Sequence, residues 1–242
     1  MAKTQQEEEV KKDVIPTTEP NLMEDPEAIS ERIEKAEEFL VKNRNLLGGI
    51  AVGILGVVAA VFFYFNYTKT QNEEAQQEMF QAVYNFEADS LKKALQGGGS
   101  QGLEAIADEY AGTDAANQAN FYIAVSKLKL GKFDEALEAI EKFSTKDPLL
   151  QARAYCIAGD IHMEKGNFED AASNYQKAAA EGANKHFTPV YLMKLGLAQE
   201  NLKKYTAAAE TYGKVADKYF DTAEAADAKK YKARVEQLAQ AN

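Results

Sequence analysis

The sequence GKFDEA at residues 131–136 returns as GNFEDA at residues 166–171. A weaker third copy, KKYTAA, occupies residues 203–208. The last residue of each copy, Ala136, Ala171 or Ala208, follows the previous one by 35 and then 37 residues. A period near 34 residues is typical of stacked helix–turn–helix units. Each copy supplies a turn residue, an aromatic ring that packs back on the first helix, and a small alanine that lets the two helices approach closely.

A second pair of similar segments supports this register. Residues 110–119 match residues 219–228, 109 positions later and close to three repeats. In both segments a threonine, Thr113 or Thr222, is expected to cap the helix that follows. The pattern predicts helix pairs near 115–144, 149–181 and 187–219, an N-terminal pair within 75–111 and a capping helix at 222–240. The predicted fold is all-α, an α-solenoid of helix hairpins with about nine helices.

These pairs resemble tetratricopeptide repeats. Small or aromatic residues occupy the packing positions of that family: Ala124, Ala136 and Pro148; Tyr155, Gly159, Ala171, Tyr175 and Ala178; Leu192, Gly196, Ala208 and Tyr212. The tryptophan of the consensus is missing, and His162 and Gln199 replace its second tyrosine. The repeats are therefore divergent.

An apolar segment precedes the repeats. Leu46 to Phe65 reads LLGGIAVGILGVVAAVFFYF and carries no charge over 20 residues. At about 1.5 Å per residue, such a helix spans the roughly 30 Å hydrocarbon core of a bilayer. A core helix of a soluble protein is the alternative, but few core helices are apolar all round. We expect a single transmembrane helix over residues 46–66, retained as a signal anchor because 45 residues precede it.

Basic residues predict the orientation of this helix. Arg32, Lys35, Lys42 and Arg44 precede the span, whereas only Lys69 follows it closely. The positive-inside rule then places the N-terminus in the cytoplasm and the repeats outside it, which in a bacterium is the periplasm. The expected location is the bacterial inner (cytoplasmic) membrane, crossed once. Aromatic residues at the outer end of the span suit the membrane interface.

Four small residues recur on one face of the span: Gly49, Gly53, Gly56 and Ala60. Small residues let transmembrane helices approach closely. The face is a candidate docking seam for a partner's helix or for a second copy of the chain. The alternative is the ordinary enrichment of glycine in transmembrane helices.

The other segments complete the predicted domain organisation. Residues 1–24 are polar and acidic and are expected to form a disordered cytoplasmic tail. Residues 25–45, with Asp25 as N-cap and Pro26 in the first turn, predict an amphipathic lead-in helix. Residues 67–96 predict a stalk that continues the membrane helix and ends at the GGGS of residues 97–100. The repeat domain is expected over residues 101–242.

Composition excludes several classes of function. The net charge of −10 argues against nucleic-acid binding, which needs a basic surface. Cys156 is the one cysteine and has no neighbouring histidine, and His162 and His186 stand apart from metal-ligand patterns. The sequence therefore predicts no cofactor, no metal and no enzymatic activity.

A binding role is then expected on the concave face, lined by the first helix of each pair. The repeat register places these residues there: Phe121, Val125, Leu128, Arg153, Asp160, Met163, Val190, Met193 and Leu197. This mostly apolar set with adaptable methionines suits hydrophobic segments of unfolded chains. Alternatively, the stalk or the C-terminal helix fills the groove as core.

The whole arrangement resembles the YfgM-like ancillary subunits of the bacterial Sec (SecYEG) translocon. The features shared are a short acidic tail, a lead-in helix ending in the basic-Asn patch VKNRN at residues 41–45, a Gly-rich anchor with aromatics at its outer end, and a Gln-rich stalk before the repeats. The resemblance implies a membrane-anchored adaptor or chaperone-like protein. Its partners would be the translocon, periplasmic folding factors and emerging client chains.

Two other functions remain open at this point. The Tyr-x-x-Thr-x-x-Ala linkers also resemble tetratricopeptide proteins of outer-membrane assembly and cell-wall coordination. Those proteins are commonly lipoproteins or soluble, and the uncleaved anchor weighs against them. An enzyme with an unusual site would need a titratable cluster in a pocket.

Overall fold

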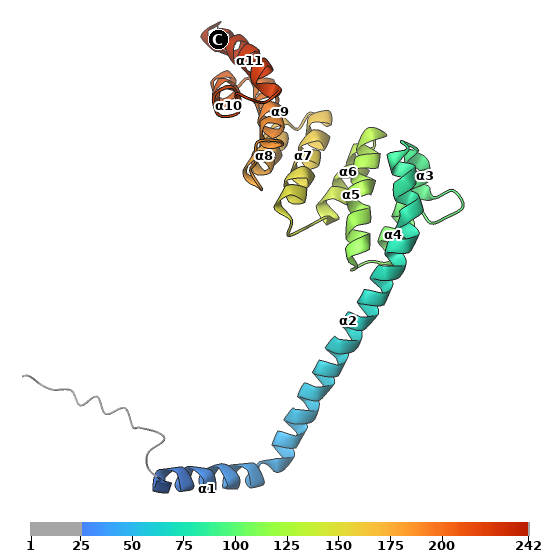
Figure 1. Ribbon diagram of the computed structural model, residues 1–242, viewed down its shortest axis with the longest axis vertical. Helices are drawn as coiled ribbons and strands as arrows, with labels where there is room; N and C mark the ends of the chain where they lie inside the picture. Colours follow the sequence, from blue (N-terminus) through green and yellow to red (C-terminus); the bar gives the residue numbers. More distant parts are fainter. Residues whose placement is uncertain (1–25, 242) are drawn as a thin grey trace, which may run out of the picture. The chain divides into compact units, whose positions relative to one another are not determined.

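A computed structural model describes residues 26–241, and every regular element in that range is a helix. The expected tail (1–24) and the Asp25 cap lie outside the described residues. The chain divides into an N-terminal unit ending at Phe63 and a C-terminal unit beginning at Tyr64. Figure 1 shows the helices of both units.

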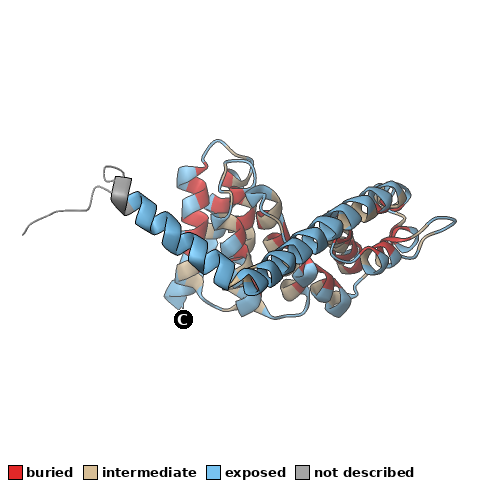
Figure 2. Cartoon of the chain, turned by 90° about the horizontal axis from the view of Figure 1, so that it is seen from below, coloured by how far each residue is buried: buried red, intermediate tan, exposed pale blue. Residues whose placement is uncertain are grey.

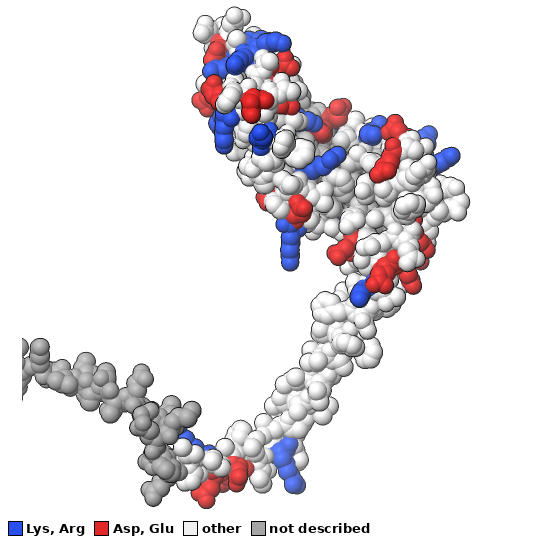
Figure 3. Space-filling view, in the orientation of Figure 1, with Lys and Arg blue, Asp and Glu red and all other residues white. Residues whose placement is uncertain are grey.

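The N-terminal unit contains α1 (Pro26–Lys42) and the first part of α2 (Arg44–Glu87). Asn43 separates the two helices, and its side-chain amide donates to the Phe39 carbonyl. Every residue from Gly48 to Phe63 is exposed (Figure 2). Among the described residues, α2 is the one helix long and apolar enough to cross a membrane. Figure 3 shows this part of α2 without charged side chains.

The C-terminal unit begins with the rest of α2, which ends at Glu87 rather than continuing to Gln96. Asp89 adopts a left-handed conformation (φ 53°), and the Ser90 amide donates to the Asn85 carbonyl at 2.8 Å. This is a hydrogen-bonding pattern that closes helices. The expected uninterrupted stalk is therefore wrong. An aspartate in place of the usual glycine explains why the sequence did not indicate the break.

Two short helices, α3 (Leu91–Gln96) and α4 (Leu103–Glu109), follow the break. The GGGS segment lies between them. Gly97 has φ 87°, and a Cβ there would collide with the Ser100 carbonyl oxygen. Only glycine fits this turn.

The remaining helices form three antiparallel pairs and a final helix, as the repeat predicts. The pairs are α5 (Asp114–Lys129) with α6 (Phe133–Lys142), α7 (Pro148–Glu164) with α8 (Phe168–Ala180), and α9 (Thr188–Asn201) with α10 (Tyr205–Lys218). The final helix is α11 (Glu224–Ala241).

The turn inside each pair has the same geometry. Gly131 and Gly166 have φ 73° and 76°, and Lys203 takes the same conformation at φ 58°. The alanine after each turn, Ala136, Ala171 or Ala208, is fully buried. The turn conformation and the buried alanine are common to the three pairs, which explains why the GKFDEA pattern repeats.

Thr113 caps α5 as expected, because its hydroxyl accepts from the Ala116 amide at 3.1 Å. Asp147, which the sequence analysis did not single out, caps α7 by accepting from the Leu149 amide at 2.8 Å. The Thr222 hydroxyl instead donates to the Tyr219 carbonyl, and α11 begins two residues later at Glu224.

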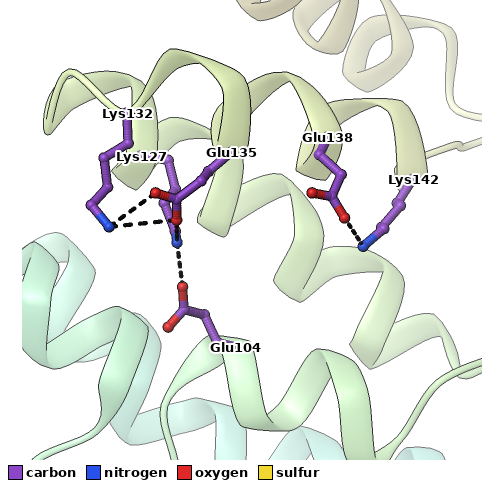
Figure 4. Close-up of polar contacts among 6 residues, drawn as sticks. All are labelled: Glu104, Lys127, Lys132, Glu135, Glu138 and Lys142. Carbon is purple, nitrogen blue, oxygen red and sulfur yellow. Dashed lines mark hydrogen bonds and ion pairs between the residues drawn. The ribbon is translucent and has the colours of Figure 1, made fainter.

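A buried cation ties the short helix α4 to the first pair. Lys127 on α5 forms ion pairs with Glu104 of α4 and Glu135 of α6 (Figure 4). The Lys132 ammonium also lies 3.1 Å from a Glu135 carboxylate oxygen. Three helices therefore meet at one ammonium group.

Candidate functional site

Four of the nine residues expected on the concave face line one pocket. Leu128 of α5, Asp160 and Met163 of α7, and Leu197 of α9 surround a space of about 630 Å³. The rest of its wall is Lys129, Gly131, Phe133, Glu164, Tyr175 and Lys194. The first helix of each of the three pairs thus contributes to a single pocket.

The other expected residues lie away from this pocket. Phe121 and Val125 pack against the N-terminal core cluster, and the Phe121 ring centroid is 5.2 Å from that of Phe143. Met193 packs against the C-terminal core cluster formed by α10 and α11. Arg153 is exposed and Val190 is half-buried.

The protein's own helices therefore fill part of the predicted face. On α2, Met79 and Ala82 join the core cluster that supports α5, and the Phe86 ring lies 5.0 Å from the Tyr122 ring. On α11, Val235 packs with Tyr212. The stalk and the last helix pack near the two ends of this face, as the alternative of a groove filled by the protein's own helices expected. Neither helix lines the pocket between α5, α7 and α9.

An ion pair forms one wall of the pocket. The Lys194 ammonium lies 2.5 and 2.7 Å from the two Asp160 carboxylate oxygens, and the Tyr175 hydroxyl donates to Asp160 Oδ1 at 2.6 Å. Burial, with the neighbouring Asp160 charge second, raises the pKa of the Tyr175 hydroxyl well above its ordinary value. Tyr175 therefore stays a protonated donor, and the apolar part of the wall is formed by Leu128, Phe133, Met163 and Leu197.

We expect Tyr175→Phe to lower the stability of the C-terminal unit by about 1–2 kcal/mol, because Asp160 loses a hydrogen bond made to a charged acceptor. Urea unfolding followed by circular dichroism measures the change. Tyr155→Phe is the matched control, since Tyr155 is only half-buried on the preceding helix. Equal stability of the two variants would show that the Tyr175 hydroxyl contributes nothing to the wall.

A second group of a tyrosine, a carboxylate and a cation, similar to Tyr175, Asp160 and Lys194, joins the next pair to the last helix. The Tyr212 hydroxyl donates to Glu200 at 2.6 Å, and Arg234 of α11 donates to both Glu200 oxygens at 2.7 and 2.6 Å. In both groups the cation follows the carboxylate by 34 residues, one repeat. The sequence analysis predicted neither pair, although opposite charges one repeat apart were a usable signal.

The cysteine and histidines contribute no chemistry to the pocket. Cys156 is buried, and burial raises the pKa of its thiol to about 12. His162 is half-buried on α7, and His186 is exposed in the α8–α9 connection. Within residues 26–241 no three histidine, cysteine or carboxylate side chains gather in a way that could hold a metal ion.

The small residues of the predicted docking seam present an open face. At Gly49, Gly53 and Gly56 an added Cβ would meet no atom within 4 Å, and Ala60 is exposed. A neighbouring helix could approach this face closely.

The helix pairs are similar to a known repeat family and to a solved structure. The tetratricopeptide repeat model matches residues 121–187 and again residues 158–224. This chain carries tetratricopeptide repeats. A crystal structure of nearly identical TPR-like repeats, from a Podosopora anserina protein assigned as a kinesin light chain, is similar with a TM-score of 0.57. The identity is 12%, over 71% of this chain and 89% of that one, so this likeness shows the fold alone. No curated protein matches the chain.

Tetratricopeptide repeats are typically binding modules without catalytic activity, and stacked helix pairs present extended surfaces to other proteins. The chain is therefore a protein-interaction scaffold. Its tetratricopeptide repeats supply the pocket between α5, α7 and α9.

Proposed function

We propose that this protein is a membrane-anchored adaptor with chaperone-like activity that binds apolar segments of client chains beside the Sec translocon. The observation that carries the proposal is the pocket shared by α5, α7 and α9. Its wall combines four apolar side chains, Leu128, Phe133, Met163 and Leu197, with the Asp160–Lys194 ion pair. The apolar side chains of this wall favour apolar client residues, and its two remaining charged residues are Lys129, which pairs with Asp89, and Glu164.

The size and composition of the pocket suit loosely specified clients. A space of about 630 Å³ accepts one or two large apolar side chains. Leu197 is 48% exposed, so it can still bury apolar surface against a partner. The flexible Met163 thioether adapts to different shapes.

Membrane anchoring is the second part of the proposal. The first part of α2 exposes its apolar side chains on every side, which is unfavourable in water and favourable in a bilayer. Basic residues before the span favour an N-terminus in the cytoplasm and repeats in the periplasm. The pocket would then be held close to the membrane, where secreted chains emerge.

Association with the translocon is the third part, and it rests on the family resemblance and on the open Gly49–Ala60 seam. The seam offers a place for a helix of the channel or of a second copy. Docking there would position the tetratricopeptide repeats near the exit of the channel.

The client-binding part predicts the effect of Leu197→Glu. We expect this variant to bind reduced, carboxymethylated α-lactalbumin, used as an unfolded probe, about tenfold more weakly than the unchanged protein, because a charge replaces apolar contact. Fluorescence anisotropy of the full-length protein in detergent measures the affinity. The matched control is Leu238→Glu on α11, which does not line the pocket. If both variants lower the affinity for the probe equally, or if neither lowers it, client binding in this pocket is contradicted.

The translocon part is tested by co-purification of the tagged full-length protein in mild detergent. We expect the Sec channel and periplasmic folding factors among the partners identified by mass spectrometry, with less of the channel for Gly49→Leu/Gly53→Leu. Ile54→Leu/Val58→Leu, on the opposite face of the helix, is the control. Recovery of outer-membrane assembly or cell-wall factors without the channel would overturn this part and favour the envelope-assembly scaffold.

A further inference from the structure

The connections between successive helix pairs lie along one edge of the C-terminal unit. They are residues 110–113, 143–147, 181–187 and 219–223, and we call this set the connection edge. Asn117 at the start of α5 exchanges two hydrogen bonds with Ser144, at 2.8 and 3.0 Å. A Cβ at Gly182 would lie 3.2 Å from the Leu149 side chain, and Lys185 lies 3.8 Å from Asp221. Each connection therefore borders the next.

Helix α2 enters the C-terminal unit at this same edge. The Asn72 side-chain oxygen accepts from the Ala115 amide at 2.8 Å, in the first turn of α5. Further along, Phe86 packs on Tyr122 and Asp89 pairs with Lys129 at 2.9 Å. Helices α2 and α5 thus run parallel. Residues 64–71 of α2 accordingly precede the point at which the helix meets the connection edge.

Large apolar side chains are exposed along the connection edge. Within this edge Phe187 is 49% exposed and Phe220 is 72% exposed, and Leu149, which adjoins the 143–147 connection in the first turn of α7, is 47% exposed. Tyr64, Phe65 and Tyr67, in the α2 segment that leads to this edge, are also exposed.

The opposite edge differs. It is formed by the turns inside the pairs, residues 130–132, 165–167 and 202–204. All of these turn residues are described by the structure, and none of the large apolar side chains among them is exposed. The exposed positions there are Gly131, Lys132, Lys165, Gly166, Asn167, Lys203 and Lys204. The connection edge has four connections and the opposite edge has three turns, but exposed large apolar side chains lie at the connection edge and at none of these three turns.

We propose that the connection edge lies on the lipid headgroup surface, with Leu149, Phe187 and Phe220 inserted into the interface. This inference rests on the anchor in the proposed function. Tyr67 and Asn72 are five residues apart on one helix, a rise of about 7.5 Å, so an anchor ending near Tyr67 keeps this edge within reach of the bilayer. Aromatic rings favour the membrane interface, and the edge continues the aromatic band of α2.

The contact is apolar rather than electrostatic. Lys185 pairs with Asp221, and Lys146 is followed by Asp147. A chain with a net charge of −10 gains nothing from adsorption to anionic lipid by charge alone. The contact therefore depends on apolar insertion and persists at high salt. Held this way, the tetratricopeptide repeats keep a fixed edge on the membrane.

The test uses the full-length protein reconstituted into phosphatidylcholine vesicles. The native Cys156 is replaced by alanine, and single cysteines carrying an environment-sensitive fluorophore are placed in separate variants. Phe187→Cys and Phe220→Cys report on the connection edge, Asn167→Cys and Lys204→Cys report on the opposite edge, and Val52→Cys reports on the span. Quenching by headgroup spin-labelled lipid is measured for the four edge positions, and quenching by a deep spin label is measured for position 52.

We expect labels at 187 and 220 to be quenched roughly twofold or more above those at 167 and 204, with the same contrast at low and high salt. Equal quenching at both edges, with position 52 quenched, would overturn the edge contact and leave the anchor intact. No quenching at position 52 would overturn the anchor and the edge contact together. A contrast that disappears in high salt would overturn the apolar insertion.

The contribution of the native rings is tested with one label. A fluorophore at Lys146→Cys lies on the connection edge without replacing an apolar residue. We expect Phe187→Ser/Phe220→Ser to reduce its quenching by about half or more, because the edge loses its inserted side chains. Both rings are exposed, so the helices should keep their circular dichroism signal. Unchanged quenching would show that the rings do not hold the edge at the lipid and would contradict the proposal.

Discussion

Gly196→Ala is expected to destabilise the C-terminal unit by about 1–3 kcal/mol, although alanine favours helices over glycine. An added Cβ at position 196 would lie 2.5 Å from Tyr212 Cζ, far inside normal contact distance. The ring cannot retreat easily, because Tyr212 is 1% exposed and its hydroxyl is bound to Glu200. Urea unfolding followed by circular dichroism, with hydrogen exchange of α9 and α10, measures the loss.

Gly213→Ala on the neighbouring helix is the matched control and should have the opposite sign. There a Cβ would meet only the Lys232 side chain, at 3.7 Å, which is ordinary contact. We expect a gain of about 0.5–1 kcal/mol from helix propensity and the reduced freedom of the unfolded chain. Destabilisation of similar size at both positions would show that glycine in these helices matters for a reason other than the Tyr212 contact.

A double mutant isolates the contact. In a Tyr212→Leu background, the cost of Gly196→Ala should fall, because the atoms that the methyl group meets are gone. Gly159 and Tyr175 form the same contact one repeat earlier, with a Cβ 2.6 Å from Tyr175 Cε1. If Gly196→Ala costs the same in both backgrounds, the ring is not the source of the strain.

The repeat period carried most of what the sequence could predict about the fold. A glycine or lysine at each turn, a ring two residues later and a buried alanine three residues after the ring impose the same local geometry three times. The end of α2 could not be predicted in this way, because Asp89 supplies a left-handed turn without the usual glycine. Propensity does not distinguish that aspartate from one on a helix surface.

The candidate site was predictable only in part. Register placed Leu128, Asp160, Met163 and Leu197 on one face, and the structure joins them in one pocket. Register could not show that α2 supports Phe121 or that α11 packs near Met193, because those contacts depend on how the end helices fold back. The Asp160–Lys194 pair joins helices of adjacent repeats, and a search for motifs along a single helix misses it.

Replacing Lys127 with methionine should weaken the junction of α4, α5 and α6 by about 1–2 kcal/mol, because a buried cation is removed from between two carboxylates. Methionine keeps most of the apolar stem, so the change tests the charge rather than the packing. The side chain of Lys127 is 8% exposed, whereas those of Glu104 and Glu135 are 36% and 49% exposed. The partial exposure of the carboxylates allows them to rehydrate, which limits the loss. Urea unfolding at pH 7 and hydrogen exchange of α4 measure it.

The exposed pair of Glu138 and Lys142, at 2.8 Å on α6, provides the control. Lys142→Met should change stability little or not at all, because exposed ion pairs gain little over their hydration. Similar losses for Lys127→Met and Lys142→Met would mean that burial adds nothing to the Lys127 junction.

The pH dependence distinguishes the charge from other effects of Lys127→Met. Burial alone lowers the pKa of the Lys127 ammonium, but hydrogen bonds to Glu104 and Glu135 outweigh it and leave that pKa above its ordinary value. The Lys127 hydrogen bond, with Lys132 second, holds the pKa of the Glu135 carboxyl below its ordinary value. A raised lysine pKa stabilises the fold below about pH 10.4 and loses this contribution as pH rises further. A lowered glutamate pKa stabilises it above about pH 4.3 and loses this contribution as pH falls.

The stability difference between the unchanged protein and Lys127→Met should therefore be constant from about pH 5 to pH 9 and shrink below about pH 4. Lys127→Met/Glu135→Gln should cost less than the sum of the two single changes, since each removes the same interaction. A difference that stays constant down to pH 3 would assign the loss to packing of the methionine side chain. Additive losses would show that Glu104 alone holds Lys127, and the first helix pair would then be joined to α4 without help from α6.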